Sequence, residues 1–276
     1  MKKKKMMVSI ILICAVAFTT WLIWSNVRVQ TSRISVLSAD LPDSFNGFRI
    51  AHVSDFHNAE LGENNRRLIE KLRDTSPDII AITGDSIDSR HTDMDLTINF
   101  IEQAMEIAQC YFVVGNHEAR FEASEYQSFE ARMIELGVIV LHNESSIIEK
   151  NGERITIFGV DDLNYDGDFY ENLKKGAEID GFTVLLSHRP EYFQEYVDNG
   201  YDLVLSGHAH GGQFRLPFIG GLYAPTQGVF PKYDAGAYTL SDTTMIVSRG
   251  LGNSSFPIRL NNSPELVIIE IQKEDE

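Results

Sequence analysis

The stretch FRIAHVSDFH, residues 48–57, opens a pattern that recurs along the chain. A run of mostly apolar residues, typical of a buried strand, is followed at once by Asp55 and His57. Two later stretches repeat the pattern, IIAITGD at residues 79–85 and YFVVGNHE at residues 111–118. Because ligands bind beyond the carboxyl ends of strands in open α/β sheets, we expect the polar residues after these runs to meet at one sheet edge.

Two further apolar runs end in the same way, Thr183–Leu186 before His188 and Leu203–Leu205 before the Gly-His-Ala-His stretch at 207–210. A lone histidine is usually packed in a core, but packing does not explain a whole set placed after strand ends. The residues that this pattern indicates are Asp55, His57, Asp85, Asn116, His117, His188, His208 and His210. The other histidines receive no role: His52 lies inside a strand, and His91 and His142 lie in expected loops.

These residue types suit divalent metal ions. Asp and Asn offer hard oxygen ligands, and neutral imidazole suits first-row transition metals. Asp55 and His57 are two residues apart, as are His208 and His210, so both members of each pair point to one side if the strand geometry continues. Two divalent ions neutralise charge on a phosphoryl group and supply a nucleophile at neutral pH, so the pattern favours phosphate-ester hydrolysis.

Outside the motifs, the apolar runs alternate with segments of helical spacing, which indicates an α/β domain with mostly buried strands. The expected helices are Asn64–Thr75, Met94–Ala108 and Ser124–Leu136. The expected strands near the end, with no helix between them, are Ala237–Leu240, Met245–Ser248 and Leu266–Ile271. We expect residues 25–47 to be a linker and residues 34–276 to form one catalytic domain.

In order and wording, the motifs resemble those of the calcineurin-like metallophosphoesterase superfamily, over about residues 48–271. The later segments at 211–213, 249–252 and 257–259 are similar to a membrane-associated bacterial branch grouped with UDP-2,3-diacylglucosamine pyrophosphatases. The resemblance implies a four-layer αββα sandwich with a two-metal site at one end.

The resemblance also implies a role for each site residue. One metal ion would take Asp55, His57 and His210, the other Asn116, His188 and His208, and Asp85 would bridge them. His117 would protonate the leaving oxygen or stabilise its developing charge, and Asp88 would orient His117. As a plain turn residue, Asp88 would have no such role. The same ligands accept Mn, Fe or Zn.

One departure from the family bears on the substrate. Family protein phosphatases carry arginine directly after the acid at Asp88, whereas here Ser89 follows and Arg90 comes one place late. This disfavours protein dephosphorylation and favours a hydrolase of phosphodiester or pyrophosphate bonds. The alternatives are a phosphomonoesterase or protein phosphatase, and a catalytically silent metal-binding module. All seven ligands and His117 are present, which argues against a silent site.

The N-terminus predicts a membrane anchor. Lys2–Lys5 precede Met6–Trp24, nineteen residues without a charge, which span about 28 Å as a helix. The aromatic end at Trp21–Trp24 suits a membrane interface; a cleaved signal peptide is the alternative. The lysines predict a single-pass protein of the cell membrane, with its N-terminus in the cytoplasm and its catalytic domain outside. Residues 1–33 would then hold the lysine run, the anchor and the start of the linker.

The charge of the remaining chain excludes one class of partner. Residues 34–276 hold all 40 acidic residues but 18 of the 24 basic ones, a net charge of −22. Nucleic-acid binding needs clustered Lys and Arg, so we expect no general nucleic-acid partner. The sequence leaves the oligomeric state open.

The segment Gln213–Tyr238 is rich in Gly, Pro and aromatic residues, among them Phe214 and Phe218. It is either an irregular extension of the core or an apolar wall beside the metals. Together with the anchor, the second interpretation predicts an amphiphilic, lipid-linked phosphoester of the cell envelope as substrate.

Overall fold

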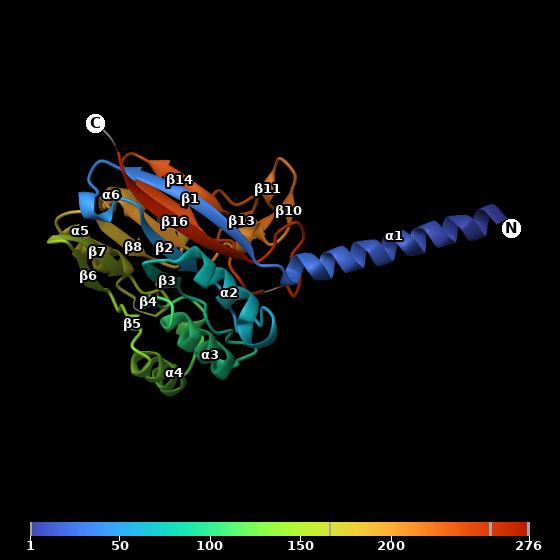
Figure 1. Ribbon diagram of the computed structural model, residues 1–276, viewed down its shortest axis with the longest axis horizontal. Coiled ribbons are helices and arrows are strands. Elements are labelled where there is room, and N and C mark those ends of the chain that lie inside the picture. Colours follow the sequence, from blue (N-terminus) through green and yellow to red (C-terminus); the bar gives the residue numbers. More distant parts are fainter. Residues whose placement is uncertain (1, 166, 254–255, 275–276) are drawn as a thin grey trace.

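The computed structural model describes residues 2–165, 167–253 and 256–274, so Met1 and the last two residues of the expected domains lie outside it (Figure 1). The helices are α1 (Lys2–Val27), α2 (Arg66–Thr75), α3 (Met94–Met105), α4 (Ala123–Glu135), α5 (Phe169–Ala177) and α6 (Phe193–Asp198). The strands of the first half are β1 (Gln30–Ser38), β2 (Phe48–Val53), β3 (Ile79–Thr83), β4 (Gln109–Val113), β5 (Ile139–Val140), β6 (Glu144–Lys150) and β7 (Glu153–Gly159). The strands of the second half are β8 (Thr183–Leu186), β9 (Leu203–Ser206), β10 (Arg215–Leu216), β11 (Gly220–Gly221), β12 (Tyr223–Ala224), β13 (Gly228–Val229), β14 (Gly236–Leu240), β15 (Thr243–Val247) and β16 (Glu265–Lys273).

Two six-stranded sheets form the centre of the fold. The first has the order β1-β16-β2-β3-β4-β5, and its strands from β2 to β5 are parallel. The second has the order β14-β15-β9-β8-β7-β6, with β15, β9, β8 and β7 parallel. Two small hairpins, β10–β11 and β12–β13, stand apart from both sheets.

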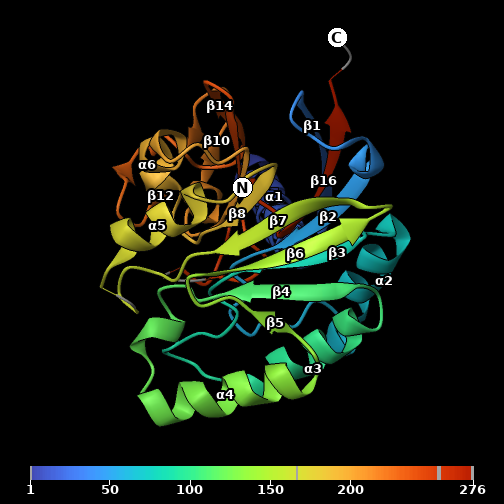
Figure 2. The ribbon, with the colours of Figure 1, turned by 90° about the vertical axis from the view of Figure 1, so that its left-hand side faces the viewer.

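The layers are held together by three separate apolar clusters. One cluster lies between the first sheet and α2, α3 and α4, a second lies between the two sheets, and a third lies between the second sheet and α5 and α6. Figure 2 shows α2 to α4 on one side of the paired sheets and α5 and α6 on the other. Since each sheet buries both faces, its strands read as continuous apolar runs. The expected four-layer αββα sandwich is confirmed.

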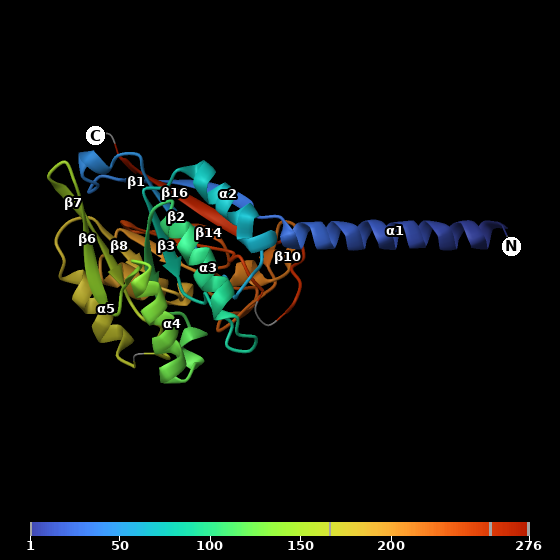
Figure 3. The same ribbon diagram turned by 60° about the horizontal axis from the view of Figure 1, so that its bottom comes forward.

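Helix α1 projects from this sandwich into open space (Figures 1 and 3). Its 26 residues are apolar and long enough to cross a membrane, and none of its most hydrophobic window is buried in the protein. Among the described residues it is the one helix with this length and composition.

The prediction of a linker at residues 25–47 is wrong. β1 pairs in parallel with β16, from Gln30 beside Glu265 to Ser38 beside Lys273, and so crosses the expected boundary after residue 33. Phe45 is fully buried in the cluster between the sheets. An edge strand with one buried face carries few apolar residues, which is why β1 has a weak sequence signal.

The predicted strands at Phe48–Val53, Ile79–Thr83 and Thr183–Leu186 are confirmed residue for residue. Strand β6 and helices α5 and α6 were not predicted. A usable signal for β6 was present: Asn151-Gly152 joins β6 to β7, and both residues have positive φ, the requirement of a tight hairpin turn.

Candidate metal centre

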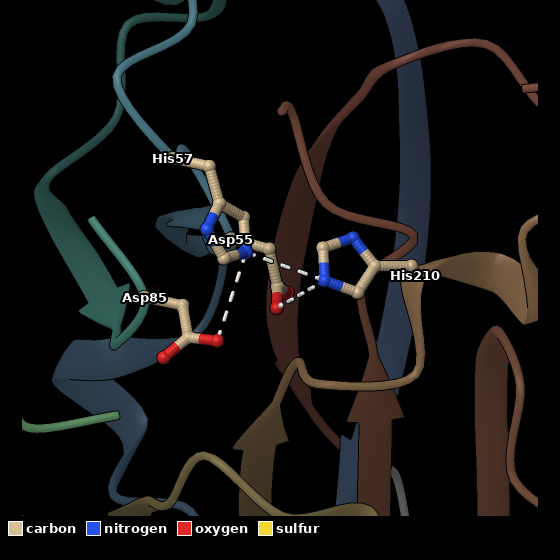
Figure 4. Close-up of side chains that lie close together, drawn as sticks. All are labelled: Asp55, His57, Asp85 and His210. Carbon is tan, nitrogen blue, oxygen red and sulfur yellow. Dashed lines mark hydrogen bonds and ion pairs between the residues drawn. The ribbon is translucent and has the colours of Figure 1, made fainter. Parts of the chain in front are cut away.

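The polar residues at the strand ends gather in three overlapping clusters. The first two share one carboxylate, and the third holds His57, Asp88 and His117. Ligand atoms of each cluster lie within 4.8 Å of one another. The first cluster holds Asp55, His57, Asp85 and His210, and the second holds Asp85, His188 and His208. Figure 4 shows the first cluster, with its side chains converging from separate segments of the chain.

Within the first cluster, the imidazoles of His57 and His210 face each other, with their Nε2 atoms 3.3 Å apart. His210 Nε2 also lies 3.3 Å from Asp55 Oδ1, and His57 Nε2 lies 3.6 Å from Asp85 Oδ2. The backbone N–H of His208 donates to both oxygens of Asp55, at 3.1 Å each. These bonds hold Asp55 in place from the segment after β9, which carries the His-x-His pair.

The second cluster lies on the other side of Asp85. His188 Nε2 is 3.2 Å from Asp85 Oδ2, 3.2 Å from Asn116 Oδ1 and 3.2 Å from His208 Nδ1. The Nδ1–H of His188 donates to the backbone carbonyl of Thr83 at 2.7 Å. This bond places a proton on Nδ1 and turns Nε2 toward the cluster, the arrangement typical of metal-binding histidines.

The expectation that strand geometry continues through the Asp-x-His and His-x-His pairs is wrong. Asp55 and His57 do share the first cluster, whereas His208 and His210 belong to different clusters. β2 ends at Val53, and β9 ends at Ser206. The residues that follow have left-handed backbones: φ is 49° at Asp55, 46° at His57, 64° at His208 and 48° at His210. Such conformations are costly for non-glycine residues and cluster at functional sites.

Close backbone contacts hold these turns together. A Cβ on Gly207 would lie 1.8 Å from Ser54 Oγ and 2.4 Å from Asp55 Oδ2, so a residue with a side chain does not fit there. The buried carboxylate of Glu118 accepts the backbone N–H groups of Asp85 at 2.8 Å and Ser86 at 2.7 Å. Glu118 received no role in the sequence analysis, although its position directly after His117 was the available signal.

Burial keeps three of the imidazoles neutral. It lowers the pKa of His57 to about 3 and holds the pKa values of His208 and His210 well below the usual range. The pKa of Asp85 is also low: burial opposes ionisation, but this cost is outweighed by His188, whose own pKa Asp85 raises to about 10 against the effect of burial. The site therefore presents an ionised carboxylate beside a protonated His188 and among three neutral imidazoles.

These residues fit divalent metal ions. The ring nitrogens that face each other lie too close for an empty polar interior to be favourable: His57 Nε2 and His210 Nε2 are 3.3 Å apart, and His188 Nε2 and His208 Nδ1 are 3.2 Å apart. Facing ring nitrogens and a low-pKa carboxylate form the mixed nitrogen and oxygen donor set that first-row transition metals accept. The donor set itself supports two adjacent cations that share Asp85.

His117 lies at the edge of the first cluster, with its ring 4.6 Å from the ring of His57. The backbone N–H of Ser89 donates to His117 Nδ1 at 3.1 Å, so the ring proton of a neutral His117 is on Nε2. Asp88 Oδ1 is 3.5 Å from His117 Nδ1, while the hydrogen bonds of this carboxylate come from the backbone and guanidinium of Arg90.

A cavity of about 600 Å³ opens beside His57 and Asp88. Its lining also includes Arg90, His91, Asn253 and Pro257. None of its described lining residues comes from Gln213–Tyr238. In that segment, Ala224 is fully buried in the third apolar cluster, whereas Phe218 is fully exposed and Phe214 is half-buried against Phe256. Part of the segment therefore extends the core, and none of its described residues lines this cavity.

The remaining histidines differ in their surroundings. His52 is buried and bonded to Thr83 Oγ1 at 2.8 Å, as its structural interpretation requires. His91 lines the cavity beside the site, which its loop position did not indicate. His142 lies outside the site, between Asp161 at 3.0 Å and Glu130 at 2.7 Å.

His142 gives a prediction about stability and pH. Its hydrogen bond with Asp161, assisted by Glu130, raises its pKa to about 9 from 6.5. Since the folded state binds this proton more tightly, the contribution is complete below about pH 6.5 and is lost as pH rises through about 9. We expect His142→Gln to lower the melting temperature most at pH 6 and least at pH 10. A melting-temperature difference that stays constant with pH would contradict the ion pair.

A pair of adjacent cation sites at the carboxyl ends of strands, between two sheets flanked by helices, defines a metal-dependent phosphoesterase. The chain belongs to the calcineurin-like phosphoesterase family, which matches residues 48–212. The expected superfamily and enzyme class are thereby confirmed.

Known proteins of this kind resemble the chain over most of its length. It is 29% identical over 250 residues to the metallophosphoesterase YkuE of Bacillus subtilis (strain 168), covering 88% of this chain and 86% of the relative. It is 27% identical over 201 residues to the phosphodiesterase YaeI of Escherichia coli (strain K12), covering 71% and 70%. The solved structure of TT1561 of Thermus thermophilus has the same fold, with a TM-score of 0.52 at 14% identity, over 74% of this chain and 90% of that chain.

Proposed function

We propose that the chain hydrolyses phosphodiester or pyrophosphate bonds with two divalent ions, Mn, Fe or Zn, that share Asp85. Asp55, His57 and His210 would hold one ion, and Asn116, His188 and His208 the other. Bound there, the ions supply charge neutralisation and a nucleophile at neutral pH. The observation that carries this proposal is the place of Asp85 Oδ2, 3.6 Å from His57 Nε2 and 3.2 Å from His188 Nε2.

His117 is proposed as the general acid. His117 Nε2 would face the leaving oxygen, because Nδ1 already accepts the N–H of Ser89 at 3.1 Å. Arg120 Nη1 lies 3.5 Å from His117 Nε2 and adds positive charge where negative charge develops. Asp88, 3.5 Å from Nδ1, is proposed as a positioning residue that acts on His117 through its charge.

Diesters and pyrophosphates are preferred over phosphorylated proteins. Arg90 lines the cavity, but its guanidinium is bound to Asp88 at 3.0 and 3.2 Å and so does not serve as a free phosphate clamp. The relative YaeI is named a phosphodiesterase, which favours the same bond class. A phosphomonoesterase remains the second candidate because Arg120 lies beside His117.

Full-length protein in detergent tests this proposal with bis-p-nitrophenyl phosphate and p-nitrophenyl phosphate. We expect turnover of the diester with added manganese, a much lower rate with the monoester, and complete loss on chelation. Metal content should be about two ions per chain. Full activity without metal would exclude the proposed site, and an inert protein with both ions bound would identify a silent module.

We further propose a lipid-linked phosphoester of the cell envelope as substrate, and membership of the branch similar to UDP-2,3-diacylglucosamine pyrophosphatases. The segments that resemble this branch border the site, which supports the proposal: Gly252 N–H donates to the backbone carbonyl of Asp55 at 2.7 Å, and Arg259 Nη2 is 3.4 Å from His210 Nδ1. The expected result is a higher kcat/KM for a lipid-linked pyrophosphate than for its water-soluble head group.

The membrane placement is also a proposal: an N-terminal anchor with the lysines in the cytoplasm, followed by one extracytoplasmic catalytic domain. Helix α1 supports it by length and composition. An alkaline phosphatase reporter fused after residue 276 should be active, and a fluorescent protein that matures in the cytoplasm should stay dark. The opposite pattern would mean that the catalytic domain lies in the cytoplasm. If the mature chain begins near residue 25, the N-terminal segment is a cleaved signal peptide and not an anchor.

A further inference from the structure

The end of helix α1 is fastened to the catalytic domain. The Asn26 side chain donates to the backbone carbonyl of Arg259 at 2.9 Å and accepts the N–H of Arg259 at 2.7 Å. Two residues, Arg28 and the buried Val29, separate α1 from β1. With so short a connection and a two-bond clamp, the helix has one preferred direction relative to the domain.

The same arginine reaches the metal centre. The Arg259 side chain is fully buried and donates to the backbone carbonyls of Arg249 at 2.6 Å and of Gly252. Its Nη2 lies 3.4 Å from Nδ1 of His210, a proposed ligand. The direction of α1 therefore also fixes the direction in which the site faces.

Beside the base of α1, apolar side chains are exposed to solvent. Figures 1 and 3 both place β10 at the end of the molecule from which α1 projects. Hydrogen bonds from Gln213 Nε2 to the carbonyl of Ile258, at 2.6 Å, and from Arg215 N to the carbonyl of Leu260, at 3.0 Å, join this hairpin to the loop before β16. We define the hairpin surface by its exposed residues Leu216, Phe218, Ile219, Phe230, Phe256 and Ile258.

We propose that the hairpin surface inserts into the lipid bilayer beside α1, as a second membrane contact of the catalytic domain. The inference rests on the proposed anchor. Exposed apolar patches of this kind mark interaction sites, and this one adjoins a helix that would enter a membrane. At the end of that helix, the Arg28 guanidinium lies 4.7 Å from the ring centre of Trp24, a pair suited to the head-group region.

The negative charge of residues 34–276 favours apolar insertion into a bilayer over electrostatic binding to its surface. Residues 34–276 carry a net charge of −22, so anionic head groups would repel most of the domain. Apolar contact and the anchor must then supply the attraction. The cavity beside His57 is lined by Pro257, which lies between Phe256 and Ile258 of the hairpin surface. Insertion would thus bring the entrance of the site to the membrane surface, where a lipid-linked head group lies.

Fluorescence quenching tests this inference on the full chain. In a Cys14→Ser background, with Cys110 buried, Phe218→Cys receives a nitrobenzoxadiazole label. The matched control is Ile147→Cys, because Ile147 is 53% exposed on β6, at the opposite end of the domain from α1 in Figure 1. Both proteins are reconstituted in phosphatidylcholine vesicles with or without a nitroxide-labelled lipid.

We expect the lipid nitroxide to quench the label at 218 severalfold more than the label at 147, and aqueous iodide to show the reverse order. If the lipid nitroxide does not quench the label at 218, the inference is wrong. This holds both when iodide quenches that label and when a second copy of the chain shields the label from iodide. If the chain does not float with the vesicles, both the proposed anchor and this inference are wrong. Turnover of the chromogenic diester on the same vesicles tests the proposed function separately and confirms that the variants fold.

Discussion

Asp85→Asn should bind neither metal ion firmly and should lose about 10³-fold or more of the diesterase rate. Its Oδ2 lies between His57 and His188, so the substitution removes the one charge common to both clusters. Metal ions contribute several kcal/mol of transition-state stabilisation, and about 4 kcal/mol corresponds to a factor of about 10³ in rate. In the native chain, the N–H of His117 donates to Asp85 Oδ1 at 2.7 Å. The asparagine side chain has the same shape and retains an oxygen that accepts this bond.

Asp55→Asn is the informative comparison, since Asp55 belongs to one cluster. It should lower the affinity for one ion and leave the other bound, as measured by mass spectrometry of the metals in dialysed protein. Asp202→Asn controls for loss of a carboxylate outside the site. The half-buried Asp202 accepts the N–H of Thr183 at 2.7 Å, at the ends of β8 and β9 that lie away from the site. Equal metal content and equal rates for the Asp85 and Asp55 variants would rule out the bridge.

His117→Asn should keep both ions and lose about 10²–10⁴-fold in rate on substrates with poor leaving groups, the usual contribution of a general acid. The loss should shrink for nitrophenyl esters, whose leaving group needs little protonation. His142→Asn, outside the site, is the control for removal of an imidazole.

A role for Asp88 would show as a milder loss in Asp88→Asn, with the same dependence on the leaving group. An unchanged rate would make Asp88 a turn residue that serves to hold Arg90. Loss of a metal ion from the His117 variant would instead place His117 among the ligands.

The buried parallel strands were predictable because both of their faces contact other layers. Continuous apolar runs such as Ile79–Thr83 then have one interpretation, and the polar residue after each run marks the edge of the sheet. The site residues could be grouped for the same reason. Their backbone geometry could not, because the left-handed turns at Asp55 and His208 are imposed by tertiary contacts such as the approach of Gly207 to Ser54.

Other features depend on contacts between residues far apart in the chain. Arg259 has an ordinary sequence context, and its burial against His210 follows from how the loop after β15 packs on the segment after β2. The hairpins β10–β11 and β12–β13 contain two-residue strands, too short for a periodic signal. The exposure of the apolar side chains on these hairpins, which underlies the proposed membrane contact, could be recognised only from the structure.

The pairing of β1 with β16 sets an order of events during synthesis. β1 directly follows the anchor, yet its partner in the sheet begins at Glu265, and β16 is also what joins β1 to β2. Closing so long a loop is slow, and unpaired strand edges are prone to aggregation meanwhile. While the residues between the two strands are being made, Gln30–Ser38 stays beside α1 without its partner strand. Under the proposed topology, the first sheet is complete only once β16 has crossed the membrane, and a chain that stops before β16 would leave an open sheet exposed to extracytoplasmic proteases.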